Sequence, residues 1–244
     1  MSKVTEVTKT ETVITYEVIP QLPGINPNLR TYVEQEIFPR YSKFFSHGIH
    51  HIYRVIADTL MLAEYYHKDF NITYAAAACH DLGLKVNRAE HERASGEIIA
   101  ADKNLLQFFS PAELQVVREA AEDHRGSRKT PPRSFYGRMI SDADRDFDLA
   151  TNAWRSLATS VKNYPELATC DEQFELCYEY LSRRITDGKH FNLWTNNPTL
   201  IKRRDKFERG FLDRDYCHTI YTEAYNRMKE DGTLKKILTY YEDF

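Results

Sequence analysis

Apolar residues recur three and four positions apart along much of the chain, which is the spacing of one face of an α-helix. Residues 51–68 (HIYRVIADTLMLAEYYHK) show this spacing most clearly. Their apolar stripe consists of Ile52, Val55, Ile56, Leu60, Ala63 and Tyr66. Residues 72–83 (ITYAAAACHDLG) are apolar on all sides until His80, so they predict a short buried helix that ends at Gly83.

Helix-start signals define a third helix over residues 110–124. Ser110 is expected to be its N-cap and Pro111 to occupy the first turn, while Glu113 completes a capping box. Three further periodic segments follow towards the C-terminus, over residues 170–188, 215–232 and 233–244. The first two of these end in a glycine, as helices often do.

The N-terminal segment follows a different pattern. Residues 10–20 (TETVITYEVIP) alternate polar and apolar positions, which is typical of a strand. A connector rich in proline, glycine and asparagine follows at residues 20–28. We therefore predict an all-α fold with a short, strand-like N-terminal arm over residues 1–30 and a single helical domain over residues 31–244.

Composition and charge narrow the classes of function. The 244 residues are 42% hydrophobic and 28% charged, with a net charge of −3, so no basic field indicates a nucleic acid or a membrane surface as partner. No apolar run approaches the roughly 20 residues of a membrane-spanning helix. The four cysteines show no metal-binding or disulfide spacing, and we expect free thiols in a cytoplasmic protein.

Histidines and aspartates gather in one part of the chain. Seven of the nine histidines lie between positions 47 and 124. They include His47 and the adjacent pair His50 and His51. His80 and Asp81 stand side by side after the four alanines 75–78, whose small side chains would let neighbouring helices approach closely. Imidazole and carboxylate together suit divalent ions such as Mn, Mg, Co, Fe or Zn. The clustering therefore predicts a metal site.

Five short motifs occur in an order that resembles the HD-domain metal-dependent phosphohydrolases. They are HGIHHIYRV, AAACHDLG, HERAS, EDHRGS and ISDADR, which together span residues 43–150. Residues 192–212 are also similar to the tail of a soluble bacterial branch of this family. The resemblance implies an HD-type helical bundle with its metal-site core at 43–150 and C-terminal helices at 151–244.

The resemblance also implies a ligand set. His51 corresponds to the first histidine of the family pattern, His80 and Asp81 to its doublet, and Asp144 to its closing aspartate, with Asp142 as the rival for the last position. His91 and His124 match histidines that some subfamilies use for a second metal. The alternative is one metal, with His91 near the mouth of the site and His124 orienting substrate. Asp81, His91 and His124 are the candidates for proton transfer.

The function that follows is hydrolysis of a phosphorylated small molecule, with a nucleotide ((d)NTP or NMP) as the expected substrate. Arginine and lysine bind phosphate well, and residues 125–141 carry five of these cations and no acid. The predicted substrate contacts are Arg125, Arg128, Lys129, Arg145 and, more weakly, Lys85. Two other classes stay open: a di-iron oxygenase of the same fold, and a nucleotide-binding module without catalysis. Oligomerisation with further copies of the chain also stays open.

Overall fold

The computed structural model describes residues 24–41, 48–128, 130–186 and 191–239. These residues are mainly helical and contain no strand, which confirms the predicted all-α class. The strand-like pattern at 10–20 lies outside the described residues. Among the described residues, no helix combines the length and the apolar character needed to cross a membrane. All four cysteines are free thiols, as predicted.

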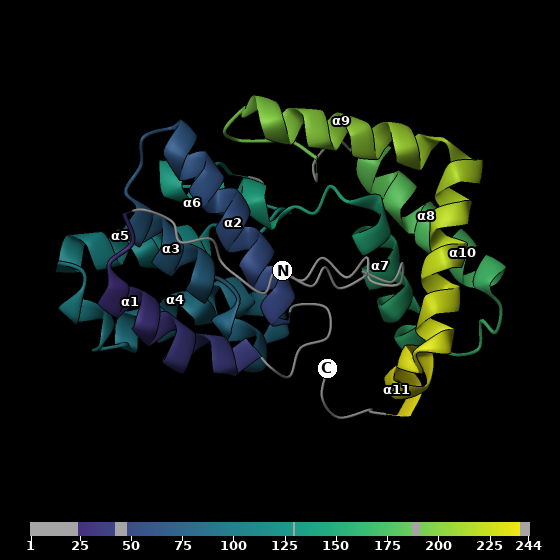
Figure 1. Cartoon of the computed structure of the whole chain (residues 1–244), viewed down its shortest axis with the longest axis horizontal. Coiled ribbons are helices and arrows are strands. Elements are labelled where there is room, and N and C mark those ends of the chain that lie inside the picture. The colour runs from purple at the N-terminus through teal and green to yellow at the C-terminus, as the bar shows by residue number, and fades with distance from the viewer. Residues whose placement is uncertain (1–23, 42–47, 129, 187–190, 240–244) are drawn as a thin grey trace, which may run out of the picture.

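The helices form two groups, which α9 (Pro198–Leu212) connects by running along both (Figure 1). The N-terminal group packs around a first hydrophobic cluster, and the C-terminal group packs around a second. The N-terminal group consists of α1 (Pro27–Tyr32), α2 (Ile49–Tyr65), α3 (Phe70–Cys79), α4 (His91–Ala101), α5 (Pro111–Glu122) and α6 (Phe135–Asp144). The C-terminal group consists of α7 (Leu149–Asn163), α8 (Cys170–Thr186), α10 (Arg214–Glu230) and α11 (Thr233–Thr239).

Helix α9 takes part in both clusters. Leu200, near its start, is buried in the first cluster, whereas Phe207 and Phe211 are buried in the second. Arg203 of α9 also pairs with Asp58 of α2 at 2.5 Å. The division into an arm at 1–30 and one domain at 31–244 stays a prediction, and the two clusters show how residues 151–244 are attached to the helices before them.

Helix α1 begins earlier than the sequence suggested. The N-terminal arm, including the connector at 20–28, was expected to extend to residue 30, but the helix starts at Pro27. The side chain of Asn26 accepts hydrogen bonds from the amides of Asn28 (2.9 Å) and Leu29 (3.5 Å), so asparagine and proline here form a helix start. Leu29 is fully buried, which fixes this short helix on the first cluster.

Helix α3 carries the alanines, and it ends earlier than predicted. Its last residue is Cys79, and a 3-10 turn, η3 (Leu82–Lys85), follows. Gly83 therefore lies inside this turn and does not end the α-helix. A Cβ at Gly83 would lie 2.6 Å from the amide nitrogen of Ser95, and closer still to the carbonyl oxygen of His91. Glycine is needed because α4 packs directly on this turn.

The other predicted helices agree with the structure. Helix α5 has the expected capping box, in which the Glu113 amide donates to Ser110 Oγ (3.3 Å) and the Ser110 amide donates to Glu113 Oε2 (2.8 Å). Helices α2, α8, α10 and α11 lie within the predicted segments or begin within two residues of them. The last part of the 170–188 and 233–244 segments lies outside the described residues.

Candidate metal centre

The ends of several helices meet at one buried place and supply the imidazoles and carboxylates. His51 lies in the first turn of α2, and His80 is the C-cap of α3. Asp81 immediately follows His80 and begins the turn η3. His91 is the first residue of α4, His124 follows the end of α5, and Asp144 is the last residue of α6. Side chains at helix ends can converge because the backbone no longer has to follow the helix axis.

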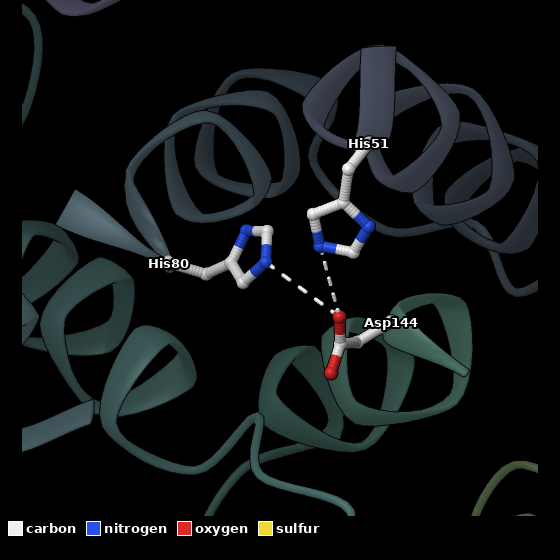
Figure 2. Close-up of side chains that lie close together, drawn as sticks. All are labelled: His51, His80 and Asp144. Atoms are coloured by element: carbon white, nitrogen blue, oxygen red, sulfur yellow. Dashed lines mark ion pairs between the residues drawn. The ribbon is translucent and has the colours of Figure 1, made fainter. Parts of the chain in front are cut away.

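His51, His80 and Asp144 point toward one another (Figure 2). Asp144 Oδ1 lies 3.2 Å from His51 Nε2 and 3.7 Å from His80 Nε2. One ligand atom from each of the three residues lies within 4.8 Å of the others. Both histidines are buried and the Asp144 side chain is partly exposed, so the two imidazoles and the carboxylate form a compact set of donors that opens to solvent at Asp144.

Asp81 joins this set to a second one. Its Oδ2 atom lies 3.5 Å from His51 Nε2 and 3.4 Å from His80 Nε2. Its Oδ1 atom lies 3.5 Å from His91 Nε2 and 3.4 Å from His124 Nε2. The two oxygens of one buried carboxylate therefore face two pairs of histidines, and this carboxylate could serve as a ligand together with either pair.

The ring nitrogens that face away from the centre are fixed by the backbone. His80 Nδ1 lies 2.7 Å from the carbonyl oxygen of Ala77, and His124 Nδ1 lies 2.6 Å from that of Ala121. A carbonyl oxygen only accepts hydrogen bonds, so each Nδ1 carries the proton and a neutral ring turns its Nε2 lone pair to the centre. Such outer contacts are typical of metal-binding histidines.

One ring nitrogen gives the most direct indication that a cation belongs at the centre. His80 Nε2 is buried and has no hydrogen-bond partner among the described residues. A buried polar atom without a partner is costly in free energy, and a cation at this point would satisfy it. The donors present therefore fit a divalent metal ion.

Comparison with protein families agrees with this geometry. The model of the HD domain matches residues 48–150, which include all six residues of the cluster. These residues form an HD domain. No curated protein and no solved structure gives a significant match to the chain. HD domains are for the most part metal-dependent phosphohydrolases, so the family agrees with the donor set.

The protonation of the HD-domain histidines differs between the two sides of Asp81. Burial lowers the pKa of His51 to about 4, although Asp144 and Asp81 act in the opposite direction. Burial also disfavours the charged form of His124, but the adjacent Asp81 carboxylate outweighs it and raises the pKa of His124 to about 9. Burial and the charge of His124 lower the pKa of His91. Without a cation, His124 therefore carries the extra proton of the cluster.

His51 has a different outer contact from His80 and His124. Its Nδ1 atom lies 3.2 Å from Nη2 of Arg54, and a guanidinium can only donate. Without a cation, this contact places the proton of a neutral His51 on Nε2, where it faces Asp144. To bind a cation through Nε2, His51 would have to carry its proton on Nδ1 and the Arg54 guanidinium would have to turn away from it. Arg54 itself is held by the backbone carbonyl oxygens of Ala143 (2.7 Å) and Asp144 (2.9 Å), so it ties α2 to the end of α6.

Asp142, the rival for the closing position, has a different environment. Its Oδ1 accepts the amide of Trp194 at 2.9 Å, and its Oδ2 accepts the amide of Thr195 at 2.8 Å. Arg145 Nη1 lies 3.1 Å from Asp142 Oδ1. Burial raises the pKa of Asp142, although these donors oppose the shift. The structure thus brings Asp144 to the histidines, and Asp142 holds the segment before α9.

The predicted substrate-binding cations lie in different surroundings. Arg125 Nη1 lies 2.9 Å from Glu92 Oε1, and Glu92 Oε2 lies 3.2 Å from His91 Nδ1, so Arg125 is close to the mouth of the centre. Arg145 is buried against α6, and Lys85 is exposed on η3. Lys129 lies outside the described residues, as does His47. The roles of these cations in binding substrate stay predictions.

Arg128 has a partner that the sequence did not reveal. Its Nη1 atom lies 2.6 Å from Oδ1 of Asp123, a fully buried carboxylate. Arg133 contacts the same carboxylate through its backbone amide, 2.6 Å from Oδ2, and through Nη2, 3.0 Å from Oδ1. This cluster holds the loop after α5 in place. It could have been predicted from Asp123, which directly precedes His124, and from the arginines that follow.

Proposed function

We propose that this protein is a metal-dependent phosphohydrolase that acts on a phosphorylated small molecule, with nucleotides as the substrate class to test first. The observation that carries the proposal is Asp81, whose two oxygens each face a pair of buried histidines. Phosphoryl transfer depends mainly on positioning and on neutralising negative charge, and a centre of this kind supplies both.

The proposed ligands form two sets that share Asp81. His51, His80, Asp81 and Asp144 would hold the first divalent cation, and Asp81, His91 and His124 would hold the second. A bound divalent cation of either set lowers the pKa of water towards neutrality and polarises phosphoryl oxygens. The identity of the metal among Mn, Mg, Co, Fe and Zn is left to experiment.

The chain's own groups account for proton transfer. His91 is the most exposed imidazole of the cluster, with 13% of its side chain accessible, whereas that of His124 is 2% accessible. The Nε2 atoms of these two histidines are within hydrogen-bond distance, so in a protein with only the first cation a proton on His124 can pass to His91 at the mouth of the centre. In that one-metal form His91 is the group we assign to protonate the leaving oxygen, whereas in the two-metal form both rings would hold the second cation instead.

The same two histidines support a second candidate function. A di-iron oxygenase of the HD fold would also use an extended histidine set, and His91 and His124 supply one. A nucleotide-binding module without catalysis has less support, because the whole ligand set is present. Metal content separates the enzymes: two tightly bound irons with visible absorption would favour the oxygenase, and exchangeable Mn, Co or Mg would favour hydrolysis.

The test is a metal-supplemented activity screen of the purified protein against a panel of nucleotides and phosphate esters, with metal analysis of the same sample. Asp81→Asn should keep the helical circular dichroism spectrum and lose metal-dependent turnover, by more than about 100-fold. His50→Ala is the matched control, since His50 is exposed on α2 next to His51. Full activity of Asp81→Asn would remove the centre from the reaction.

The proposal also includes the cellular location of the protein and its binding partner. The four free thiols support a reducing, cytoplasmic location. The predicted partner is a small molecule, since the net charge of −3 argues against nucleic acid.

A further inference from the structure

The end of helix α3 lies in the interior of the protein, where its backbone carbonyl groups have no access to water. The last carbonyl groups of an α-helix find no amide partner inside the helix, and solvent or side chains have to supply the donors. Residues 75–80 are fully buried, which excludes solvent here. A buried carbonyl oxygen without a donor is costly in free energy. The end of α3 therefore depends on side chains.

Two side chains supply donors to consecutive carbonyl oxygens at this end. The ring of His80 donates from Nδ1 to the carbonyl oxygen of Ala77, at 2.7 Å. The hydroxyl group of Tyr41 donates to the next carbonyl oxygen, that of Ala78, at 2.8 Å. The first contact orients the imidazole of His80, and the second holds the backbone from which His80 and Asp81 project.

The Tyr41 hydroxyl occupies a position that a longer helix would use. In a continued α-helix the carbonyl oxygen of Ala78 would accept the amide of Leu82, four residues later. Here α3 ends at Cys79, and the backbone at Asp81 has left the helical conformation, with φ −105° and ψ 9°. The hydroxyl thus stabilises the point at which the chain leaves α3, directly before the two adjacent metal ligands.

Tyr41 comes from a segment that precedes the HD-domain match. It is the last residue of the 3-10 turn η2 (Phe38–Tyr41), and residues 48–150 are the ones that match the HD domain. Its side chain belongs to the first hydrophobic cluster, and only 1% of the residue is exposed. Burial raises the pKa of Tyr41 well above its usual value, so the hydroxyl keeps its proton and stays a donor.

We propose that Tyr41 is a positioning residue of the metal centre, whose hydroxyl fixes the end of α3 so that His80 and Asp81 face the other ligands. The inference rests on the metal centre of the proposed function and is independent of the reaction. Ala78 precedes His80 by two residues and Asp81 by three, so a shift of its peptide group would move both ligands. Asp81 takes part in both proposed ligand sets, and its displacement would weaken both.

The test is titration of the metal-free full chain with Co²⁺, followed by the visible absorption of the bound ion, which reports both affinity and ligand geometry. Tyr41→Phe removes only the hydroxyl. It should raise the Kd of Co²⁺ by about 10-fold or more and alter the absorption band, because contacts that orient metal ligands typically contribute this much. Circular dichroism before the titration checks that the helices are retained.

Helix α3 offers two matched controls. Tyr74→Phe removes another buried hydroxyl, which has no hydrogen-bond partner among the described residues, and it should leave Co²⁺ affinity unchanged. Ile72→Val removes a buried methyl group more than one turn before Ala78, so it should lower the melting temperature and keep the affinity. The rise in melting temperature on adding excess Co²⁺ is a second readout, and it should be smaller for Tyr41→Phe than for Ile72→Val.

Two results would overturn the positioning role. One is wild-type Co²⁺ affinity and absorption in Tyr41→Phe, even with a lower melting temperature, because the hydroxyl would then serve stability alone. The other is an equal loss of affinity in Ile72→Val. Failure of the proposed function looks different. A chain that depends on Tyr41 for Co²⁺ affinity but releases no phosphate from any substrate refutes the hydrolase and retains the positioning role. Hydrolysis with equal Co²⁺ affinity in both forms does the reverse.

Discussion

The Nε2 atoms of His91 and His124 lie 3.1 Å apart, although the Nδ1 atom of each ring faces a backbone carbonyl oxygen. Two neutral imidazoles held in this way would direct two lone pairs at each other. A proton or a cation must therefore lie between them. In the metal-free protein the raised pKa of His124 supplies the proton, and in the proposed enzyme the second cation replaces it.

Replacing His124 tests this second cation. His124→Gln should reduce the metal content after dialysis from two ions per chain to one, because the first set, around His51 and His80, is left intact. The measurement is elemental analysis of the protein against its absorbance, and His50→Ala is the control. One ion in both the wild type and the variant would leave His91 and His124 as a proton-transfer pair beside a single metal.

Arg128 should matter for stability. Arg128→Ala removes a donor from the buried Asp123 carboxylate, so the free energy of unfolding should fall by about 1–3 kcal/mol, near the lower end because Arg133 remains. Chemical denaturation followed by circular dichroism measures it. Lys103→Ala, an exposed lysine before α5, is the control and should change little.

The substrate role predicted for the same loop has a kinetic signature. If the loop binds phosphate, Arg128→Ala/Lys129→Ala should raise KM for a triphosphate more than it lowers kcat. The comparison is made well below the unfolding temperature of the variant, so that the loss of the Asp123 contact does not reduce the active fraction. An unchanged KM would assign this loop to the surface.

Gly83 should tolerate no side chain. In Gly83→Ala the new methyl group would meet the amide of Ser95 and the carbonyl of His91, so α4 must move, at a cost of about 1–3 kcal/mol. That movement would also displace His91 from Asp81, so metal affinity and thermal stability should fall together. Gly126→Ala is the control, since its nearest neighbour is 3.9 Å away. Wild-type stability in Gly83→Ala would contradict the close approach.

Tyr32 gives a pH-dependent prediction outside the centre. Burial and a hydrogen bond to Asp102 raise the pKa of Tyr32 to about 12, above the value near 10 of an unfolded chain. A group whose folded pKa is raised stabilises the fold fully below the unfolded value, and this contribution is lost as pH rises from about 10 through 12. Tyr32→Phe should therefore be less stable than the wild type at pH 8, and the difference should shrink above pH 10. A difference that is constant with pH would exclude the phenol as its source.

The order of motifs was enough to predict which side chains would come together. His51, His80, Asp81 and Asp144 are far apart in sequence, and the helical fold that the motifs imply brings them to one point. The choice between Asp144 and Asp142 could not be made from sequence, since both are aspartates on the same helix. It depends on the amides of Trp194 and Thr195, which a segment some 50 residues later brings to Asp142.

The partners of the charged side chains were harder to predict than the metal ligands. The arginines after His124 appeared available for phosphate because no acid lies among them, but Asp123, directly before His124, engages two of them from the end of the preceding helix. Sequence identifies the groups that a reaction needs, whereas their partners depend on contacts between distant segments.

The attachment of residues 194–195 to Asp142 has a consequence for shortened forms of the protein. A fragment cut after residue 150 would contain every imidazole and carboxylate of the cluster, yet it would lose the two amides and the hydroxyl that Asp142 accepts. It would also expose Asp58 of α2, which pairs with Arg203 of α9. Asp142, on the helix that ends in Asp144, would then keep Arg145 as its remaining described partner. Residues 48–150, which match the HD domain, therefore depend on the second half of the chain for some of their buried polar contacts.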